Sequence, residues 1–179
     1  MSTIRIKAKS YISVIVLLSS AIVAPSSWAH DNCTPYTAVF HLEGSNPFGP
    51  LNGGGIYNIG DQAPQQAQVS AVLKGSASFN PAASVMEVKY SDMVLFPPGP
   101  DGSLNILTAI DKSIASATGP GTFEATTKSR ITGGTGLYED VTGRAFSTNV
   151  TSIDLTTGYT VSDVQVKGII CGIGEANNN

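Results

Sequence analysis

The chain reads Ile131-Thr-Gly-Gly-Thr-Gly-Leu-Tyr-Glu-Asp-Val-Thr-Gly143 at its most specific stretch. Gly133, Gly134 and Gly136 can adopt φ > 0 or approach another backbone closely, which Thr, Leu or Val do only at a cost in strain. The glycines follow an alternating segment, residues 122–132. The motif is therefore predicted to end a strand and to turn the chain sharply.

A nucleotide-binding loop is the alternative interpretation, because Thr-Gly-Gly-x-Gly resembles the opening of a dinucleotide fingerprint. That fingerprint requires a third glycine where this chain has Glu139, then a helix and an acidic residue about 20 positions further on. The downstream pattern is strand-like instead. A structural turn is favoured.

Period-two alternation predicts strands along most of the chain and gives no helical periodicity after the N-terminal segment. The predicted strands cover residues 34–43, 67–79, 85–96, 104–116, 122–132, 144–155 and 158–171. The stretch 44–64 is rich in Gly and Pro, so it is expected to be a long loop with a short extended piece near 56–59, capping or gating one mouth. Seven to nine such strands predict an all-β domain, either a closed antiparallel barrel or a sandwich.

The first 29 residues fit a signal peptide. Arg5, Lys7 and Lys9 precede an apolar run, residues 12–23, and Ser27-Trp28-Ala29 provides small residues for cleavage after Ala29. The run is too short and too rich in serine to remain as a membrane anchor. The sequence predicts an exported protein, periplasmic or extracellular, with one domain over residues 30–174 and a disordered tail over 175–179.

Removal of the signal takes away three of the ten Lys and Arg and leaves 150 residues with seven cations against 13 acids, a formal charge of −6. The cations are scattered along the sequence, and no basic patch is expected. This balance argues against nucleic acid or an anionic membrane surface as the partner.

Cys33 and Cys171 are the two cysteines of the chain. In an exported protein a lone pair is most simply a disulfide, here one that links the first predicted strand to the last. A pair of buried free thiols is the alternative. His30 and His41 are the two histidines, so no zinc ligand set with recognisable spacing exists and no metal or cofactor is expected.

The glycine-rich stretch ending at Gly143 resembles the Ile-Thr-Gly-Gly-(Ser/Thr)-Gly-x-(Phe/Tyr)-Glu-x-Ala-x-Gly segment of the allene oxide cyclase family. It is also similar to the Gly-Gly-Thr-Gly segment of plant dirigent proteins, which share that barrel. Glu139 is closer to the cyclase pattern, since dirigent proteins usually carry Arg where this chain has Thr142. Lys167-Gly168-Ile169 resembles the closing strand of the cyclases. The resemblance covers about the C-terminal half and implies an eight-stranded antiparallel β-barrel of calycin-type shape.

The candidate catalytic residues are single polar side chains on strands. Asp92 lies in an apolar row; buried without a cation, it would have a raised pKa and serve as a general acid or polar anchor. A bulge that places it in solvent is the alternative. His41 and Glu43 share a face of the first strand, and the resemblance places them where the plant cyclases carry an essential Glu and an Asn. Solvated surface is the alternative for His41.

The resemblance also implies a function, because allene oxide cyclases fold a reactive lipid epoxide inside a mostly apolar barrel. The leading hypothesis is an exported barrel that holds a small apolar or amphipathic molecule and promotes its cyclisation or isomerisation. The alternatives are a non-catalytic ligand-binding or dirigent-like barrel and a filled barrel that acts as a structural or interaction module. Members of both families commonly form dimers or trimers, so a homo-oligomer is implied.

Overall fold

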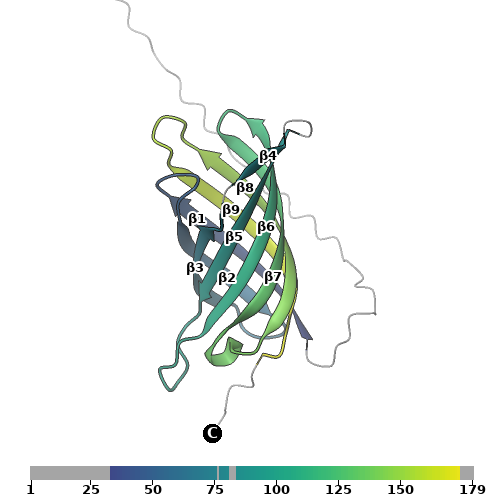
Figure 1. The fold of residues 1–179 in the computed structure, drawn as a ribbon. Helices are drawn as coiled ribbons and strands as arrows, with labels where there is room; N and C mark the ends of the chain where they lie inside the picture. Colours follow the sequence, from purple (N-terminus) through teal and green to yellow (C-terminus); the bar gives the residue numbers. More distant parts are fainter. Residues whose placement is uncertain (1–32, 76, 81–83, 174–179) are drawn as a thin grey trace, which may run out of the picture.

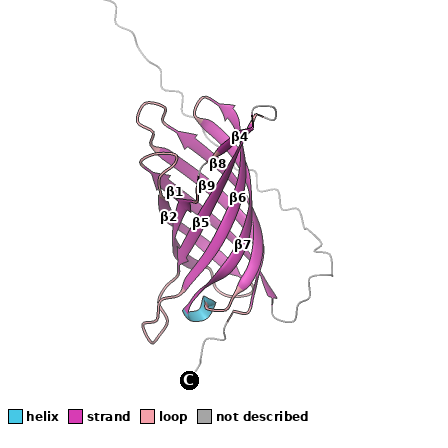
Figure 2. Ribbon diagram, viewed as in Figure 1, coloured by secondary structure: helices cyan, strands magenta, loops and turns pink. Residues whose placement is uncertain are grey.

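The computed structural model describes residues 33–75, 77–80 and 84–173, which form a closed antiparallel β-barrel (Figure 1). The signal peptide predicted for residues 1–29 and the tail predicted for 175–179 lie outside the described residues. One 3₁₀ turn interrupts the strands (Figure 2). The elements are β1 (Cys33–Gly44), β2 (Leu51–Ile59), β3 (Gln65–Leu73), β4 (Ser78–Asn80), β5 (Val85–Leu95), β6 (Ile106–Gly119), β7 (Thr122–Thr135), η2 (Gly136–Tyr138), β8 (Thr142–Ile153) and β9 (Thr160–Cys171).

Pairing between β3 and β5 closes the sheet into a barrel of eight strands, in the order β1-β2-β3-β5-β6-β7-β8-β9 and back to β1. The short β4 pairs with the first residues of β5, beyond the part of β5 that pairs with β3. Every pairing is antiparallel, as expected for short connections between consecutive strands. The predicted eight-stranded antiparallel barrel is confirmed.

Alternation along each strand separates the inside of the barrel from the outside. In β7, Ala125 and Thr127 are buried and face inward, while Thr126, Lys128 and Arg130 are exposed. We call the end that carries the β1–β2, β6–β7 and β8–β9 loops the upper end, as in Figure 1. The start of β1, the end of β9 and η2 lie at the lower end.

Strand β2 corrects the sequence prediction, because residues 51–59 of the stretch expected to be a long loop form a nine-residue strand. Gly53 pairs with Leu42 and Gly55 with Phe40. A Cβ at Gly53 would overlap the carbonyl oxygen of His41, and one at Gly55 would overlap that of Val39. Glycine therefore allows β1 and β2 to approach closely in the strongly curved wall, and the true loop is residues 45–50.

The glycine motif forms the predicted corner between β7 and β8. A bulge at Thr132 breaks the register with β6, and Gly133 and Gly136 have φ of +120° and +60°. A Cβ at Gly136 would overlap Oδ1 of Asn105. That oxygen accepts a hydrogen bond from the backbone N–H of Leu137 at 3.1 Å, and the Asn105 amide donates to the carbonyl of Pro97 at 2.9 Å. The corner is thereby fixed against the β5–β6 loop.

Aromatic rings fill the lower half of the barrel. Tyr57 lies 4.9 Å from both Phe40 and Phe96, centroid to centroid, and Phe96 stacks on Tyr138 at 4.7 Å. Tyr36 stacks on Tyr57 at 6.1 Å from the other side. Such contacts contribute about 0.5–1.5 kcal/mol each beyond burial of area. These rings pack the lower part of the barrel interior.

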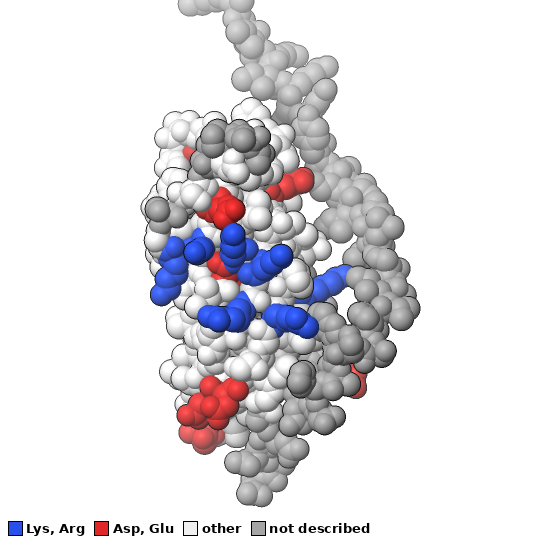
Figure 3. Space-filling model, turned by 45° about the vertical axis from the view of Figure 1, so that its right-hand side comes forward, with Lys and Arg blue, Asp and Glu red and all other residues white. Residues whose placement is uncertain are grey.

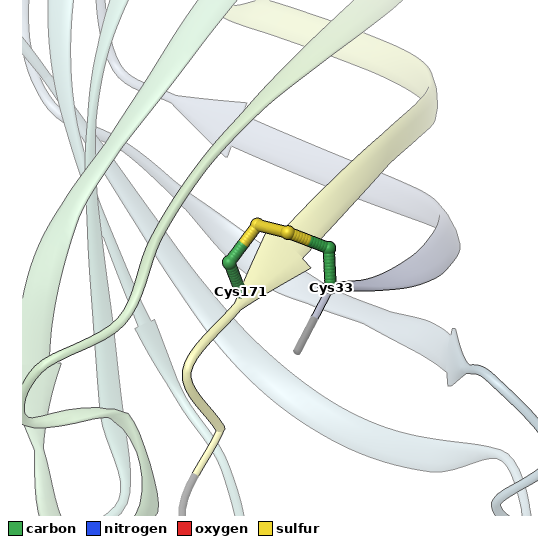
Figure 4. The surroundings of a disulfide bond; sticks show 2 residues. All are labelled: Cys33 and Cys171. Carbon is green, nitrogen blue, oxygen red and sulfur yellow. A yellow bond between two sulfur atoms is a disulfide. The ribbon is translucent and has the colours of Figure 1, made fainter. Parts of the chain in front are cut away.

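A disulfide joins Cys33 to Cys171 at the lower ends of β1 and β9 (Figure 4). The two residues are direct partners in the sheet, with Cα atoms 3.9 Å apart and 138 positions of sequence between them. The predicted disulfide is confirmed. A disulfide persists in oxidising surroundings, so this bond is compatible with an exported protein.

The outer surface corrects the expectation that the cations are scattered. Lys and Arg side chains of the described residues gather across the middle of the face shown in Figure 3, while the acids visible there lie mostly toward its two ends. Cations far apart in the sequence become neighbours because strands β5 to β9 place them at matching heights.

Candidate functional site

A cavity of about 230 Å³ lies in the upper half of the barrel. Its floor is formed by Tyr36 and Tyr57, which belong to the aromatic cluster below. Pro47 and Phe48 of the β1–β2 loop line the opposite end, and Phe48 is 57% exposed. The cavity therefore opens at the upper end, beside the loop predicted to cap one mouth.

The cavity has one apolar side and one side, called the polar side below, on which polar and apolar side chains are mixed. Strands β1 to β3 contribute apolar side chains, and strands β6 to β9 contribute most of the polar ones. The apolar side includes Phe40, Leu42, Leu51, Val69 and Ala71, and the polar side includes Ser113, Thr127, Ser129, Ser147, Asn149, Thr151, Thr160 and Ser162. This division suits a molecule that is itself amphipathic.

The hydroxyls of the polar side are paired across and along the strands. Thr127 donates to Ser113 at 3.0 Å, and both residues are buried. The hydroxyls of Thr151 and Ser162 lie 3.0 Å apart, and Ser147 donates to Oδ1 of Asn149 at 3.1 Å. A hydroxyl oxygen that takes part in one such bond can still accept another, so this side can receive hydrogen bonds from a bound molecule.

Two carboxyl groups, Asp92 on β5 and Asp111 on β6, line the same cavity. Asp92 is opposite Ala109, and Asp111 is opposite Tyr90 and Ser129, so the two acids are diagonal neighbours on one face. Each has an Oδ1 atom that is buried and accepts no hydrogen bond from the described residues. Unsatisfied buried oxygens are rare in folded proteins, so this pair calls for a polar partner in the cavity.

The surroundings of the pair favour one retained proton. Burial raises the pKa of Asp92 well above its usual value, and the neighbouring Asp111 charge raises that pKa further. Burial also raises the pKa of Asp111, while hydrogen bonds from Asp92 and Ser129 oppose that rise. The pair is therefore expected to retain one proton above the usual pH range of aspartate, as two carboxyls that share one site do. Such an acid is able to give a proton to a ligand.

The structure places the three predicted site residues in two separate locations. Asp92 faces the cavity as predicted. His41 and Glu43 lie on the outer face of β1, where Nε2 of His41 is 3.2 Å from Oε1 of Glu43 and Nδ1 is 2.7 Å from Oδ1 of Asp163. Their side chains are 56% and 51% exposed, so the barrel wall separates them from Asp92.

Sequence reasoning missed Asp111. In a half-buried strand the apolar residues usually face inward. Around Asp111 the reverse holds, because Ile110 and Ile114 are exposed while Asp111 and Ser113 are buried. The sequence pattern of such a strand therefore predicts that the polar residues face solvent and the apolar residues face the interior. Asp111 is identified by its position beside Asp92 across β5 and β6, and the sequence alone does not give that register.

Within the described residues, His, Cys, Asp and Glu do not form a group of three or more suited to a metal ion. The part of the chain that the structure describes holds no helix of sufficient length and apolarity to cross a bilayer. Comparisons of the chain with protein-family models, curated proteins and solved structures give no match.

Proposed function

We propose that this barrel, working after export, holds a small amphipathic molecule in its upper cavity. The two buried and unpartnered Oδ1 atoms of Asp92 and Asp111 carry this proposal, since a ligand that bears a hydroxyl or amine would satisfy them. The apolar part of the ligand would lie along β1 to β3. An eight-stranded barrel is also what the resemblance to allene oxide cyclases implies, although this cavity carries more polar groups than the mostly apolar one of those enzymes.

The cavity sets limits on the ligand. Its volume of about 230 Å³ is below the roughly 300–1,000 Å³ of pockets for drug-sized molecules. The ligand is therefore small, or its far end extends through the mouth beside Phe48. No cation lines the cavity, so an anionic group is expected to remain outside.

Cyclisation or isomerisation of the bound molecule is the second candidate function, favoured by the raised pKa of the Asp92 carboxyl in the cavity. Asp92 would donate a proton to an oxygen of the ligand, such as an epoxide oxygen, while a C–O bond opens. The rearranged ligand would then return a proton to Asp92, so that the composition of the molecule is unchanged. Confinement against the apolar side would select one folded conformation.

Native mass spectrometry of the protein purified from its own host tests the binding proposal. We expect a bound mass of a few hundred daltons. Ala125→Trp places a large ring in the cavity and should abolish that mass, whereas Thr126→Trp, on the next residue and facing outward, should preserve it. A wild-type spectrum without ligand, or equal retention by both variants with native circular dichroism, contradicts the proposal.

The catalytic proposal has its own experiment. If Asp92 drives an isomerisation, Asp92→Asn protein purified from the host should carry the substrate, while wild-type protein carries the product. The two compounds would have the same mass and different chromatographic retention times. Identical retention times with similar occupancy would leave the barrel as a binding protein and reject the isomerase.

A further inference from the structure

The basic surface on the outside of the barrel is independent of the cavity. Lys89, Lys112 and Lys128 are successive direct partners on β5, β6 and β7, and the same row continues through Phe146 to Lys167 on β9. Arg130 and Arg144 are direct partners in the adjacent row, and Lys74 donates its backbone N–H to the carbonyl of Lys89. We call these seven cations, all exposed, the basic belt.

Few acids offset the belt. Glu87 is the one carboxylate within two residues of a belt cation on the same strand face, and it forms a 2.8 Å ion pair with Lys112. Glu124 and Asp163 lie four residues from Lys128 and Lys167, about 13 Å along the strand. Among the described residues no ion pair is formed by Lys89, Lys128, Arg130 or Lys167.

This arrangement is unfavourable for the isolated barrel. Like charges directly opposite each other on neighbouring strands destabilise a sheet, and the belt contains such pairs at Lys89–Lys112 and Lys112–Lys128. The mature chain nevertheless carries a negative formal charge overall. A concentration of every described cation on one face, against this repulsion, is explained by an anionic partner that neutralises it.

We propose that the basic belt binds a linear anionic polysaccharide, one that bears uronate or sulfate groups. The main row crosses from β5 to β9, about half of the eight strands, with neighbouring strands roughly 4.8 Å apart. A flexible chain can follow that curved row around the barrel. A flat bilayer meets a cylinder along only a few strands, so it would leave part of the belt without a partner.

Nucleic acid fits the belt less well. Single-stranded nucleic acid is bound through several aromatic platforms together with cations, and Phe146 is the one exposed aromatic side chain in the rows of the belt. The Cys33–Cys171 disulfide also suits an oxidising compartment, where polysaccharides rather than nucleic acids are the common polyanions.

Calorimetric titration with heparin and with polygalacturonate at 50 and 200 mM salt tests the proposal, because these probes carry sulfate and uronate respectively. We expect binding at 50 mM salt that weakens steeply at 200 mM, as counterion release requires. The double variant Lys128→Gln/Arg130→Gln should bind at least tenfold more weakly. The control Gln66→Glu/Gln68→Glu has the same change in net charge at the same spacing on β3, outside the belt, and should bind within about twofold of wild type.

Three results would overturn the inference. The first is a failure of wild-type protein to bind either polysaccharide at 50 mM salt. The second is an equal loss of affinity in the two double variants, both with native thermal unfolding. The third is that the protein binds single-stranded DNA or phosphatidylglycerol vesicles more tightly than both polysaccharides, and that this binding also depends on Lys128 and Arg130. Such a result would assign the belt to that partner instead. The cavity plays no part in any of these measurements.

Discussion

Asp92 on β5 and Asp111 on β6 face one cavity as diagonal neighbours, and each keeps an Oδ1 atom buried without a hydrogen-bond partner among the described residues. Two carboxyls in an environment without a cation cannot both ionise cheaply. The pair therefore connects the stability of the barrel to pH, and it gives the cavity an acid that is protonated above the usual pH range of aspartate.

The first prediction concerns Asp92→Asn. Burial and the Asp111 charge raise the pKa of Asp92 above the 3.8 of an unfolded aspartate, so the folded state binds more protons. Wild-type stability should then fall as pH rises from about 4 through the folded pKa. Asn does not titrate, so the stability of the variant relative to wild type should increase across that range. Thermal unfolding between pH 4 and 8 measures the difference.

Asp101→Asn is the matched control for that experiment. Hydrogen bonds from the Ser103 side chain and backbone lower the pKa of the exposed Asp101, so its contribution is present above the unfolded pKa and is lost as pH falls. The control should lose stability relative to wild type toward neutral pH, the opposite sign. Parallel pH profiles for Asp92→Asn and wild type would contradict the raised pKa.

The second prediction concerns Gly136→Ala at the β7–β8 corner. Ala at φ of +60° costs about 1–2 kcal/mol, and its Cβ would also overlap Oδ1 of Asn105. We expect a loss of about 3 kcal/mol or more in the free energy of unfolding, measured in urea. Gly102→Ala has φ of +80° and open space around its Cβ, so it should lose only about 1–2 kcal/mol. Equal losses would show that Asn105 yields and that contact with it does not fix the corner.

The sequence predicted those elements whose residue pattern follows from local backbone geometry. Alternation located β7, and glycines at positive φ located the corner after it, because both are local properties of the backbone. Strand β2 was missed since its glycines serve close approach to β1 rather than a turn, and only the paired strand reveals that. The residue type shows that glycine permits either a turn or a close approach of two strands. The position of the neighbouring strand determines which of the two occurs.

The cavity and the basic belt were beyond the sequence for a related reason. Asp92 was identified by its apolar row, yet its partner Asp111 depends on the β5–β6 register. Lys89 and Lys128 are 39 positions apart in the sequence and are separated by one strand in the barrel. Register between strands is a tertiary property, so sites built across several strands appear only once the sheet is closed.

The third prediction concerns the disulfide. Replacement of Cys33 and Cys171 by Ser opens a loop of 138 positions, which in the chain-entropy model costs about 4–5 kcal/mol of stability. The main-chain pairing of β1 with β9 extends from Cys33 to Gly44, so the barrel itself should still close. We expect a lower melting temperature with native circular dichroism. Reductant should lower the melting temperature of wild type and leave that of the double variant unchanged; a wild type insensitive to full reduction contradicts this account.

The fourth prediction concerns His41, whose two ring nitrogens both lie against carboxylates. An imidazole that donates from both nitrogens is the protonated form, so the Asp163 and Glu43 hydrogen bonds raise the pKa of His41 above 6.5. NMR titration should show that elevated value, with the signal assigned by His41→Gln. Asp163→Asn should lower the pKa more than Glu43→Gln does, since the Asp163 hydrogen bond is the larger cause.

The same variant separates surface chemistry from the cavity. His41 lies on the outer face of β1, and the wall of the barrel stands between it and Asp92, so His41→Gln should retain any ligand that wild-type protein retains. It should also leave the difference between Asp92→Asn and wild type unaltered, because distant sites contribute additively. If His41→Gln loses the bound molecule, the outer face of β1 is part of the functional site. That result would contradict the assignment of the site to the cavity alone.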